Sequence, residues 1–189
     1  MKPIVVGVSN RHLHLSQSDL EILFGAGHQL TPVKDLGQPG QYACDEQVTL
    51  VGPKGSIEKV RVLGPVRSRT QVEVSLTDAF KLGIKPPVRE SGDLAASAPI
   101  SIVGPNGRVD LEDGAILAWR HIHMHTSDAA EYGLQDKDMV QVRIGGDRGI
   151  ILENVVVRVR DDYAMEMHVD TDEANAALLK NGQIVEIVR

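Results

Sequence analysis

The stretch VTLVGPKGSIEKVRVLGPVRSRTQVEVSLTDA, residues 48–79, alternates β-branched with polar residues on both sides of a Gly-Pro-Lys-Gly turn. A second stretch, VQVRIGGDRGIILENVVVRVRDDYAMEMHVDTDEA, residues 140–174, has the same order of strand, glycine turn, strand, arginine-bearing segment and helix start. Period-two alternation indicates half-buried strands, and a glycine turn between two strands indicates an antiparallel hairpin. The chain is therefore expected to contain an internal repeat. In this register Glu73 aligns with Glu166, and Ser75 aligns with His168.

A shorter motif precedes each of these stretches. RHLHLSQSDLEILFG, residues 11–25, and RHIHMHTSDAAEYGL, residues 120–134, both read Arg-His-x-His, then a Ser or Thr cap, then a short helix. Several short strands with only brief helices favour small barrels or sandwiches. The sequence thus predicts a mainly β protein with short helices, in which an internal repeat relates two β-barrel domains.

The length of 189 residues fits one large domain or two small ones. KPPVRESGDLAASA, residues 85–98, is rich in Pro, Ser and Ala without apolar periodicity, so it is interpreted as a linker. This places the first barrel domain at residues 1–90, with the HLH pair, and the second at 91–189, with the HIH pair. Strands are allowed to exchange across the boundary.

Charge and composition exclude several classes of function. The net charge is −6 and no two Lys or Arg are adjacent, which argues against sequence-independent binding of nucleic acid. No apolar stretch reaches the roughly 18–20 residues of a membrane span, and the start lacks the pattern of a signal peptide. A cytoplasmic location without membrane contact is therefore expected. The single cysteine, Cys44, is interpreted as a buried thiol.

Two histidine pairs have the spacing of a chelating unit. Residues i and i+2 of a strand point to one face with Cα atoms roughly 6.5–7 Å apart, so two imidazoles can meet one metal ion. The pairs are His12 with His14 and His121 with His123. Packing alone explains a single pair easily, but two pairs at equivalent places of a repeat favour metal binding, because buried imidazoles need partners for both nitrogens.

Zinc usually takes three or four protein ligands, so further ligands are needed for two ions. The strand ends VEVS and MEMH offer Glu73 and His168, with Glu166 as a spare candidate. An exposed strand carboxylate is the competing interpretation of both glutamates. Arg67 lies a few residues before Glu73, and a guanidinium binds phosphate through two hydrogen bonds. Arg120 is equally compatible with an exposed position on a strand.

The motifs VGVSNRHLHLS, VTLVGPKG, LGPVRSRTQVEVS, WRHIHM and MEMHVDTDEANA occur in order over nearly the whole chain. With them the chain resembles the PduL-type phosphate propanoyltransferase family. The resemblance implies two β-barrel domains and two zinc ions between them. Motif by motif, the resemblance implies that the metal ligands are His12, His14, Glu73, His121, His123 and His168. It also implies that Arg67 binds phosphate.

The sequence departs from the family pattern at two places. Members commonly have Ser or Thr followed by Pro after the second pair, whereas this chain has His125 there, as a passenger or a shifted ligand. Members from bacterial microcompartments often carry an amphipathic N-terminal extension, whereas a strand is expected here within three residues of Met1. That favours a free cytosolic enzyme over one in a microcompartment lumen.

The expected reaction interconverts a short-chain acyl-CoA, propanoyl-CoA or acetyl-CoA, and phosphate with acyl phosphate and coenzyme A. Phosphate is expected to attack the thioester directly at a dinuclear zinc site. Functional coupling to an acyl kinase is expected, and a homo-oligomer is left open. Two alternatives remain, a zinc hydrolase of esters, thioesters or amides and a non-catalytic module in which zinc only joins the barrels.

Overall fold

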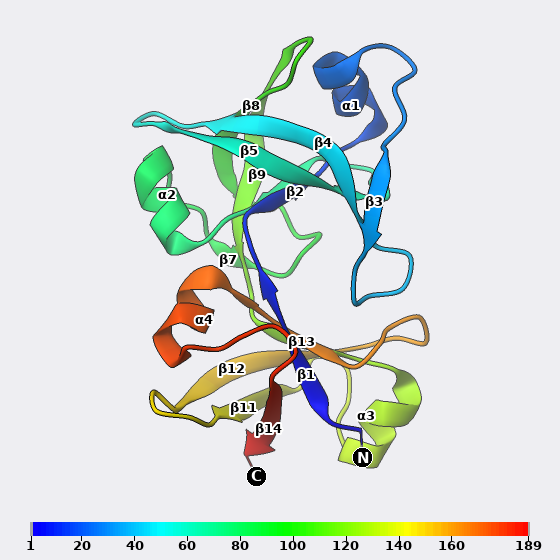
Figure 1. Cartoon of the computed structure of the whole chain (residues 1–189), viewed down its shortest axis with the longest axis vertical. Helices are drawn as coiled ribbons and strands as arrows, with labels where there is room; N and C mark the ends of the chain where they lie inside the picture. The colour runs from blue at the N-terminus through cyan, green and yellow to red at the C-terminus, as the bar shows by residue number, and fades with distance from the viewer. Residues whose placement is uncertain (1, 189) are drawn as a thin grey trace. The chain divides into compact units, whose positions relative to one another are not determined.

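The computed structural model describes residues 2–188, and these divide into two compact units. The HLH barrel comprises Asn10–Leu36 and Gly40–Ala118. The HIH barrel comprises the first strand, the short segment Gly37–Pro39 and the chain from Trp119 onwards. Figure 1 shows both units with their elements labelled.

Strands dominate the described residues, and the four helices among them are short, which confirms the predicted fold class. None of these helices has the length and apolar content needed to cross a bilayer. The elements are, in order, β1 (Ile4–Ser9), β2 (His12–His14), α1 (Gln17–Phe24), β3 (Pro32–Asp35), β4 (Tyr42–Val51), β5 (Ser56–Gly64), β6 (Gln71–Glu73), α2 (Leu76–Leu82), β7 (Val88–Arg89), β8 (Ala98–Val103), β9 (Arg108–Ala118), β10 (His121–Met124), α3 (Thr126–Tyr132), β11 (Met139–Ile144), β12 (Ile150–Val159), β13 (Glu166–Asp170), α4 (Thr171–Ala177) and β14 (Ile184–Val188).

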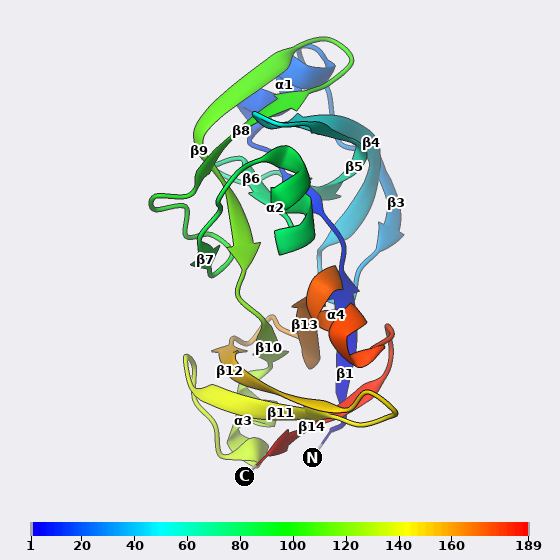
Figure 2. The ribbon, with the colours of Figure 1, turned by 90° about the vertical axis from the view of Figure 1, so that its left-hand side faces the viewer.

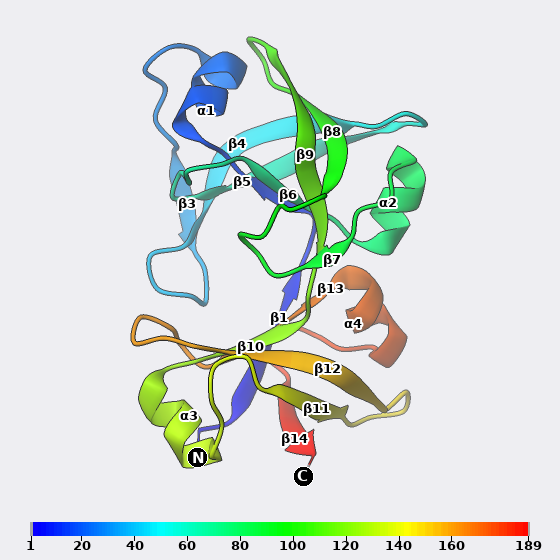
Figure 3. The same cartoon turned by 180° about the vertical axis from the view of Figure 1, so that it is seen from behind.

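Each unit is a closed ring of six strands. The HLH barrel closes in the order β4-β5-β2-β6-β9-β8, with β3 added at β4 and β7 added at β9. Figure 2 labels the strands of this barrel other than β2. The HIH barrel closes in the order β1-β13-β10-β12-β11-β14 (Figure 3). Closure leaves no free edge in either ring, so the backbone donors and acceptors of the six strands are paired.

The two rings have the same sequence of strand directions. In the HIH barrel β1 is parallel to β13 and β10 is parallel to β12, while the other four pairs are antiparallel. In the HLH barrel β9 is parallel to β6 and β2 is parallel to β5, and the other four are again antiparallel. The two rings also share an irregular backbone conformation within one strand. Lys59 in β5 and Asn154 in β12 both have positive φ, at 57° and 53°.

The first strand of each repeat lies in the barrel of the other repeat. β1 precedes β2 in the sequence, yet it pairs in the HIH barrel. β9 precedes β10 in the sequence, yet it pairs in the HLH barrel. Only Asn10 and Arg11 join β1 to β2, and only Trp119 and Arg120 join β9 to β10. A two-residue hairpin turn needs positive φ, and none of these four residues has it. Neither two-residue connection is therefore a tight hairpin turn.

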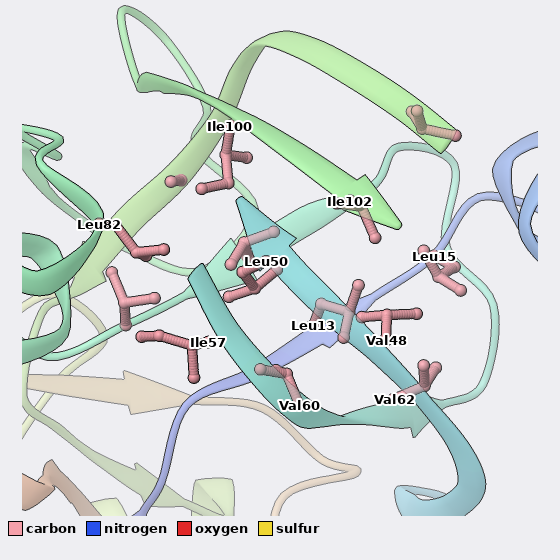
Figure 4. Close-up of a cluster of buried hydrophobic side chains, with 14 of the residues drawn as sticks. Leu13, Leu15, Val48, Leu50, Ile57, Val60, Val62, Leu82, Ile100 and Ile102 are labelled. Carbon is pink, nitrogen blue, oxygen red and sulfur yellow. The ribbon is translucent and has the colours of Figure 1, made fainter. Parts of the chain in front are cut away.

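Val, Ile and Leu fill the interior of both barrels. Figure 4 shows Leu13, Leu50 and Ile102 within the cluster of the HLH barrel, and all three are completely buried. Ile122 and Val157 are completely buried in the HIH barrel. Each such side chain contributes about 1.5–3 kcal/mol on burial, so aliphatic residues can supply both cores although aromatic residues are few.

The division between the units does not coincide with the predicted boundary at residue 90. Residues 91–118 belong to the HLH barrel and β1 to the HIH barrel, so strands are exchanged between the sequence halves. The interpretation of residues 85–98 as a linker is wrong, because β7 pairs with β9 and Leu94 is 4% exposed. A two-residue strand and an isolated buried leucine produce no apolar periodicity, so the sequence pattern does not reveal this packing.

Candidate metal centres

The HLH group consists of His12, His14 and Glu73. Strand β2 carries both imidazoles on one face, and antiparallel pairing places Glu73 of β6 directly opposite His12. All three side chains are buried, and one potential ligand atom from each lies within 4.8 Å of the others. The Nε2 atom of His12 is 3.4 Å from Oε2 of Glu73. The alternation of β2 thus turns Leu13 into the core and the histidines toward the carboxylate.

The HIH group consists of His121, His123 and His168. Strand β10 carries the pair, and antiparallel pairing places His168 of β13 opposite His121. One potential ligand atom from each lies within 4.8 Å of the others. The ring of His168 lies 5.1 Å from that of His121 and 5.0 Å from that of His123, centroid to centroid. Three of the six predicted ligands therefore converge in each barrel, and their role as ligands stays a prediction.

Strand pairing corrects the alignment of the two repeats. Because Glu73 faces His12 and His168 faces His121, Glu73 is the counterpart of His168. The predicted alignment of Glu73 with Glu166 is wrong by two residues, as is that of Ser75 with His168. The helix caps agree with the structural register, since Ser75 caps α2 and Asp170 caps α4, each two residues after the third member of its group.

Backbone carbonyl groups fix the tautomer of the first histidine in each pair. Nδ1 of His12 is 2.8 Å from the carbonyl oxygen of Asn10, and Nδ1 of His121 is 2.7 Å from that of Trp119. A carbonyl oxygen only accepts, so both Nδ1 atoms carry the proton and donate. Nε2 of each ring then carries the lone pair, and a lone pair of this kind is what a metal ion binds.

The second histidine of each pair fits a metal ligand for a different reason. The Nδ1 atoms of His14 and His123 are buried, and neither has a hydrogen-bond partner within residues 2–188. Burial, together with the nearby His12 and Arg67, lowers the pKa of His14 to about 3, and burial lowers that of His123 still further. Both rings are therefore neutral, as ligands must be. Imidazoles with one carboxylate and no thiolate suit zinc.

A hydrogen-bond network holds Glu73 in place. Its Oε1 atom accepts from Nε2 of Gln71 at 2.6 Å and from Oγ of Ser91 at 2.8 Å. Burial alone would raise the pKa of Glu73, but the electrostatic interaction with the imidazoles of His12 and His14 and the hydrogen bond from Ser91 outweigh it and lower that pKa. The carboxylate therefore stays ionised, with Oε2 directed to His12.

Arg67 reaches this network through Ser91. The Nη1 atom of Arg67 donates to Oγ of Ser91 at 3.1 Å, so one serine separates the guanidinium from Glu73. Sequence reasoning missed Ser91, because it lies in the segment interpreted as a linker. No signal in the sequence marks it, since a serine after Glu in a Pro-rich stretch is typical of loops.

The other polar residues of the motifs have structural roles. Arg120 donates to Glu173 at 2.8 Å, and Arg11 pairs with Asp78 at 2.8 Å. Asp78 is the third residue of α2, which follows the strand that carries Glu73. Glu173 is the third residue of α4, which follows the strand that carries His168. Arg120 is thus not an exposed strand arginine. His125 caps α3 by accepting from the backbone N–H of Ser127 at Nδ1, and it belongs to neither converging group.

Comparisons with known proteins show which family the chain resembles. Residues 5–180 match the family model described as phosphate propanoyltransferase. The phosphate propanoyltransferase of Thermotoga maritima is 63% identical over 98% of this chain and 89% of its own length. Those of Rhodopseudomonas palustris and Lachnoclostridium phytofermentans are each 53% identical over 98% of this chain, covering 82% and 87% of their own lengths. The chain therefore belongs to the phosphate propanoyltransferase family, as its motifs predicted.

Proposed function

We propose that this chain is a phosphate acyltransferase that moves a propanoyl or acetyl group between coenzyme A and phosphate, with one zinc ion at the HLH group and one at the HIH group. The observation that carries the proposal is the pair of converging groups, one of which is connected to Arg67 through Ser91. The names of the relatives supply the substrate class.

Arg67 is the proposed phosphate-binding residue. Its guanidinium presents a fork of donors that matches two phosphate oxygens, and one of its nitrogens is already held by Ser91. Ser91 also holds Glu73, so phosphate bound by Arg67 lies near the HLH group. Preorganisation of this kind lowers the entropic barrier of a reaction between two substrates.

In the proposed reaction a phosphate oxygen forms a bond to the thioester carbonyl carbon, and the carbon–sulfur bond then breaks. Coenzyme A leaves as a thiolate, whose pKa near 8–9 makes a dedicated general acid unnecessary. When bound, zinc supplies Lewis-acid stabilisation of negative charge on oxygen. Arg67 orients the nucleophile, while Gln71 and Ser91 keep Glu73 in position.

Cys44 takes no part in this scheme. It is completely buried in the HLH barrel, and burial raises the pKa of its thiol to about 11. A protonated, enclosed thiol is a poor nucleophile, so an acyl-enzyme on Cys44 is not expected. Turnover should therefore survive Cys44→Ala.

A thiol-release assay with acetyl-, propanoyl- and butanoyl-CoA, with and without phosphate, tests the proposal on protein of known zinc content. Release that requires both phosphate and zinc is expected. Release without phosphate would instead identify a hydrolase, and zinc-bound protein without any release would identify a purely structural metal role. Sharing of one reaction centre by the two ions and coupling to an acyl kinase stay predictions. The acyl phosphate formed in the proposed reaction would be the substrate of that kinase.

A further inference from the structure

A second carboxylate lies beside the HIH group. Glu166 is two residues before His168 on β13, and its Oε2 atom is 2.9 Å from Nε2 of His168. It occupies the place that Gln71 has in the HLH barrel, because Glu166 faces His123 as Gln71 faces His14. The competing interpretations are a fourth metal ligand and a carboxylate that orients His168.

Distances distinguish these two roles. Two ligand atoms at about 2.0–2.1 Å from one tetrahedral zinc ion lie roughly 3.3 Å apart. The 3.4 Å between His12 Nε2 and Glu73 Oε2 fits two ligands of one ion. The 2.9 Å between His168 and Glu166 is shorter and fits a hydrogen bond between an imidazole N–H and a carboxylate.

We propose that Glu166 is a positioning residue of the HIH group, which accepts a hydrogen bond from Nε2–H of His168 and so makes Nδ1 the metal-binding atom of that ring. This inference rests on the proposed zinc ion at the HIH group. A carboxylate behind a ligating imidazole fixes the tautomer and ring orientation, and it makes the ligating nitrogen more basic.

The surroundings of Glu166 hold its carboxylate in one place. Gln38 donates from Nε2 to Oε2 of Glu166 at 3.1 Å, and the same amide exchanges two hydrogen bonds with the backbone of Ala164. A Cβ atom on Gly37 would lie 2.2 Å from Oε2 of Glu166, and one on Gly7 would lie 2.8 Å from Oε1. Glycine at both positions therefore gives the carboxylate the room it occupies.

The test uses the zinc-loaded full chain and measures the affinity of each ion by competition with a chelator. Glu166→Gln keeps the size of the side chain and removes its charge, so zinc at the HIH group should bind about 10–100-fold more weakly. His123→Ala identifies which affinity belongs to that group. Glu153→Gln, which changes an exposed carboxylate on β12 of the same barrel, is the matched control and should change neither affinity.

A spectroscopic measurement tests the tautomer directly. In protein loaded with cadmium-113 and labelled with nitrogen-15, the metal coupling of His168 should appear at Nδ1. Gly37→Ala gives an independent variant, because the atoms it crowds are the flexible end of Glu166, and it should weaken the same ion while the HLH ion stays bound. Coupling at Nε2, or unchanged affinity in Glu166→Gln, overturns the inference. A wild-type chain that binds no metal at the HIH group would instead overturn the proposed function.

Discussion

The HLH and HIH groups have one backbone plan and two different ligand chemistries. In both, a strand with two histidines pairs antiparallel with a strand that presents the third side chain opposite the first histidine. That side chain is the carboxylate of Glu73 in one barrel and the imidazole of His168 in the other. A carboxylate neutralises part of the charge of a divalent ion and an imidazole does not. The repeat thus preserves positions while the electrostatics of the two proposed ions diverge.

The arginines that follow show the same divergence. The backbone N–H of Arg67 donates to the carbonyl of Leu15, and that of Arg160 donates to the carbonyl of Met124, so both arginines occupy one place in the plan. Arg67 donates to Ser91, which in turn donates to Glu73 of the HLH group. The side chain of Arg160 is 62% exposed and pairs with Asp162 at 2.7 Å. In the HLH barrel this arginine therefore joins the network around Glu73, and in the HIH barrel it lies over the ring of Tyr163 with most of its side chain exposed.

The largest expected effect is the loss of a ligand from either group. His14→Ala and His123→Ala should each remove one zinc ion per chain and lower turnover about a thousand-fold, because a Lewis-acid ion contributes several kcal/mol. Metal analysis beside the thiol-release assay measures both quantities. His28→Ala, on a loop of the HLH barrel, is the matched control and should keep both ions. Full turnover in either ligand variant would contradict the proposed role of that group.

The next effect is a pH dependence of stability in the metal-free chain. The unfolded chain binds more protons than the folded chain between the ordinary pKa of His14, 6.5, and its folded value of about 3. Stability should therefore be complete above pH 6.5 and fall on acidification by up to about 1.4 kcal/mol per pH unit, and His123 acts in the same direction. Urea unfolding over this range measures it. Equal slopes in wild type and His14→Gln would contradict the assignment.

The arginines should differ in their effect on phosphate. Arg67→Gln should raise KM for phosphate about 10–100-fold, since a charge-assisted hydrogen bond contributes about 1.5–3 kcal/mol. Arg160→Gln should change it less than about threefold, because an exposed ion pair contributes little. Steady-state kinetics with varied phosphate compare the two. An unchanged phosphate dependence in Arg67→Gln would remove that residue from the site.

The smallest expected difference is between the two arginines that precede the histidine pairs. Arg11→Met leaves the carboxylate of Asp78, whose side chain is 4% exposed, without its ion pair. Arg120→Met leaves the carboxylate of Glu173, whose side chain is 20% exposed, without its ion pair. The first should cost about 2–3 kcal/mol of unfolding free energy and the second about 1–2 kcal/mol, because the more deeply buried acid loses more. Denaturant midpoints on zinc-loaded protein compare them. A larger loss for Arg120→Met would reverse this ranking.

The sequence alone predicted the repeat, the mainly β fold and the six candidate ligands, but not which three side chains meet in each barrel. Period-two alternation and His-x-His spacing are local signals, and the strand geometry converts them directly into shared faces.

The structure was needed to show which strands close each barrel, that Glu73 corresponds to His168, and that Ser91 and Gln38 support the carboxylates. These features depend on pairing between segments far apart in the chain. A two-residue shift of a strand keeps the same side chains facing inward, so inward-facing patterns cannot distinguish the two registers. The hydrogen bonds of Ser91 and Gln38 are made by loops, where no period exists to reveal them.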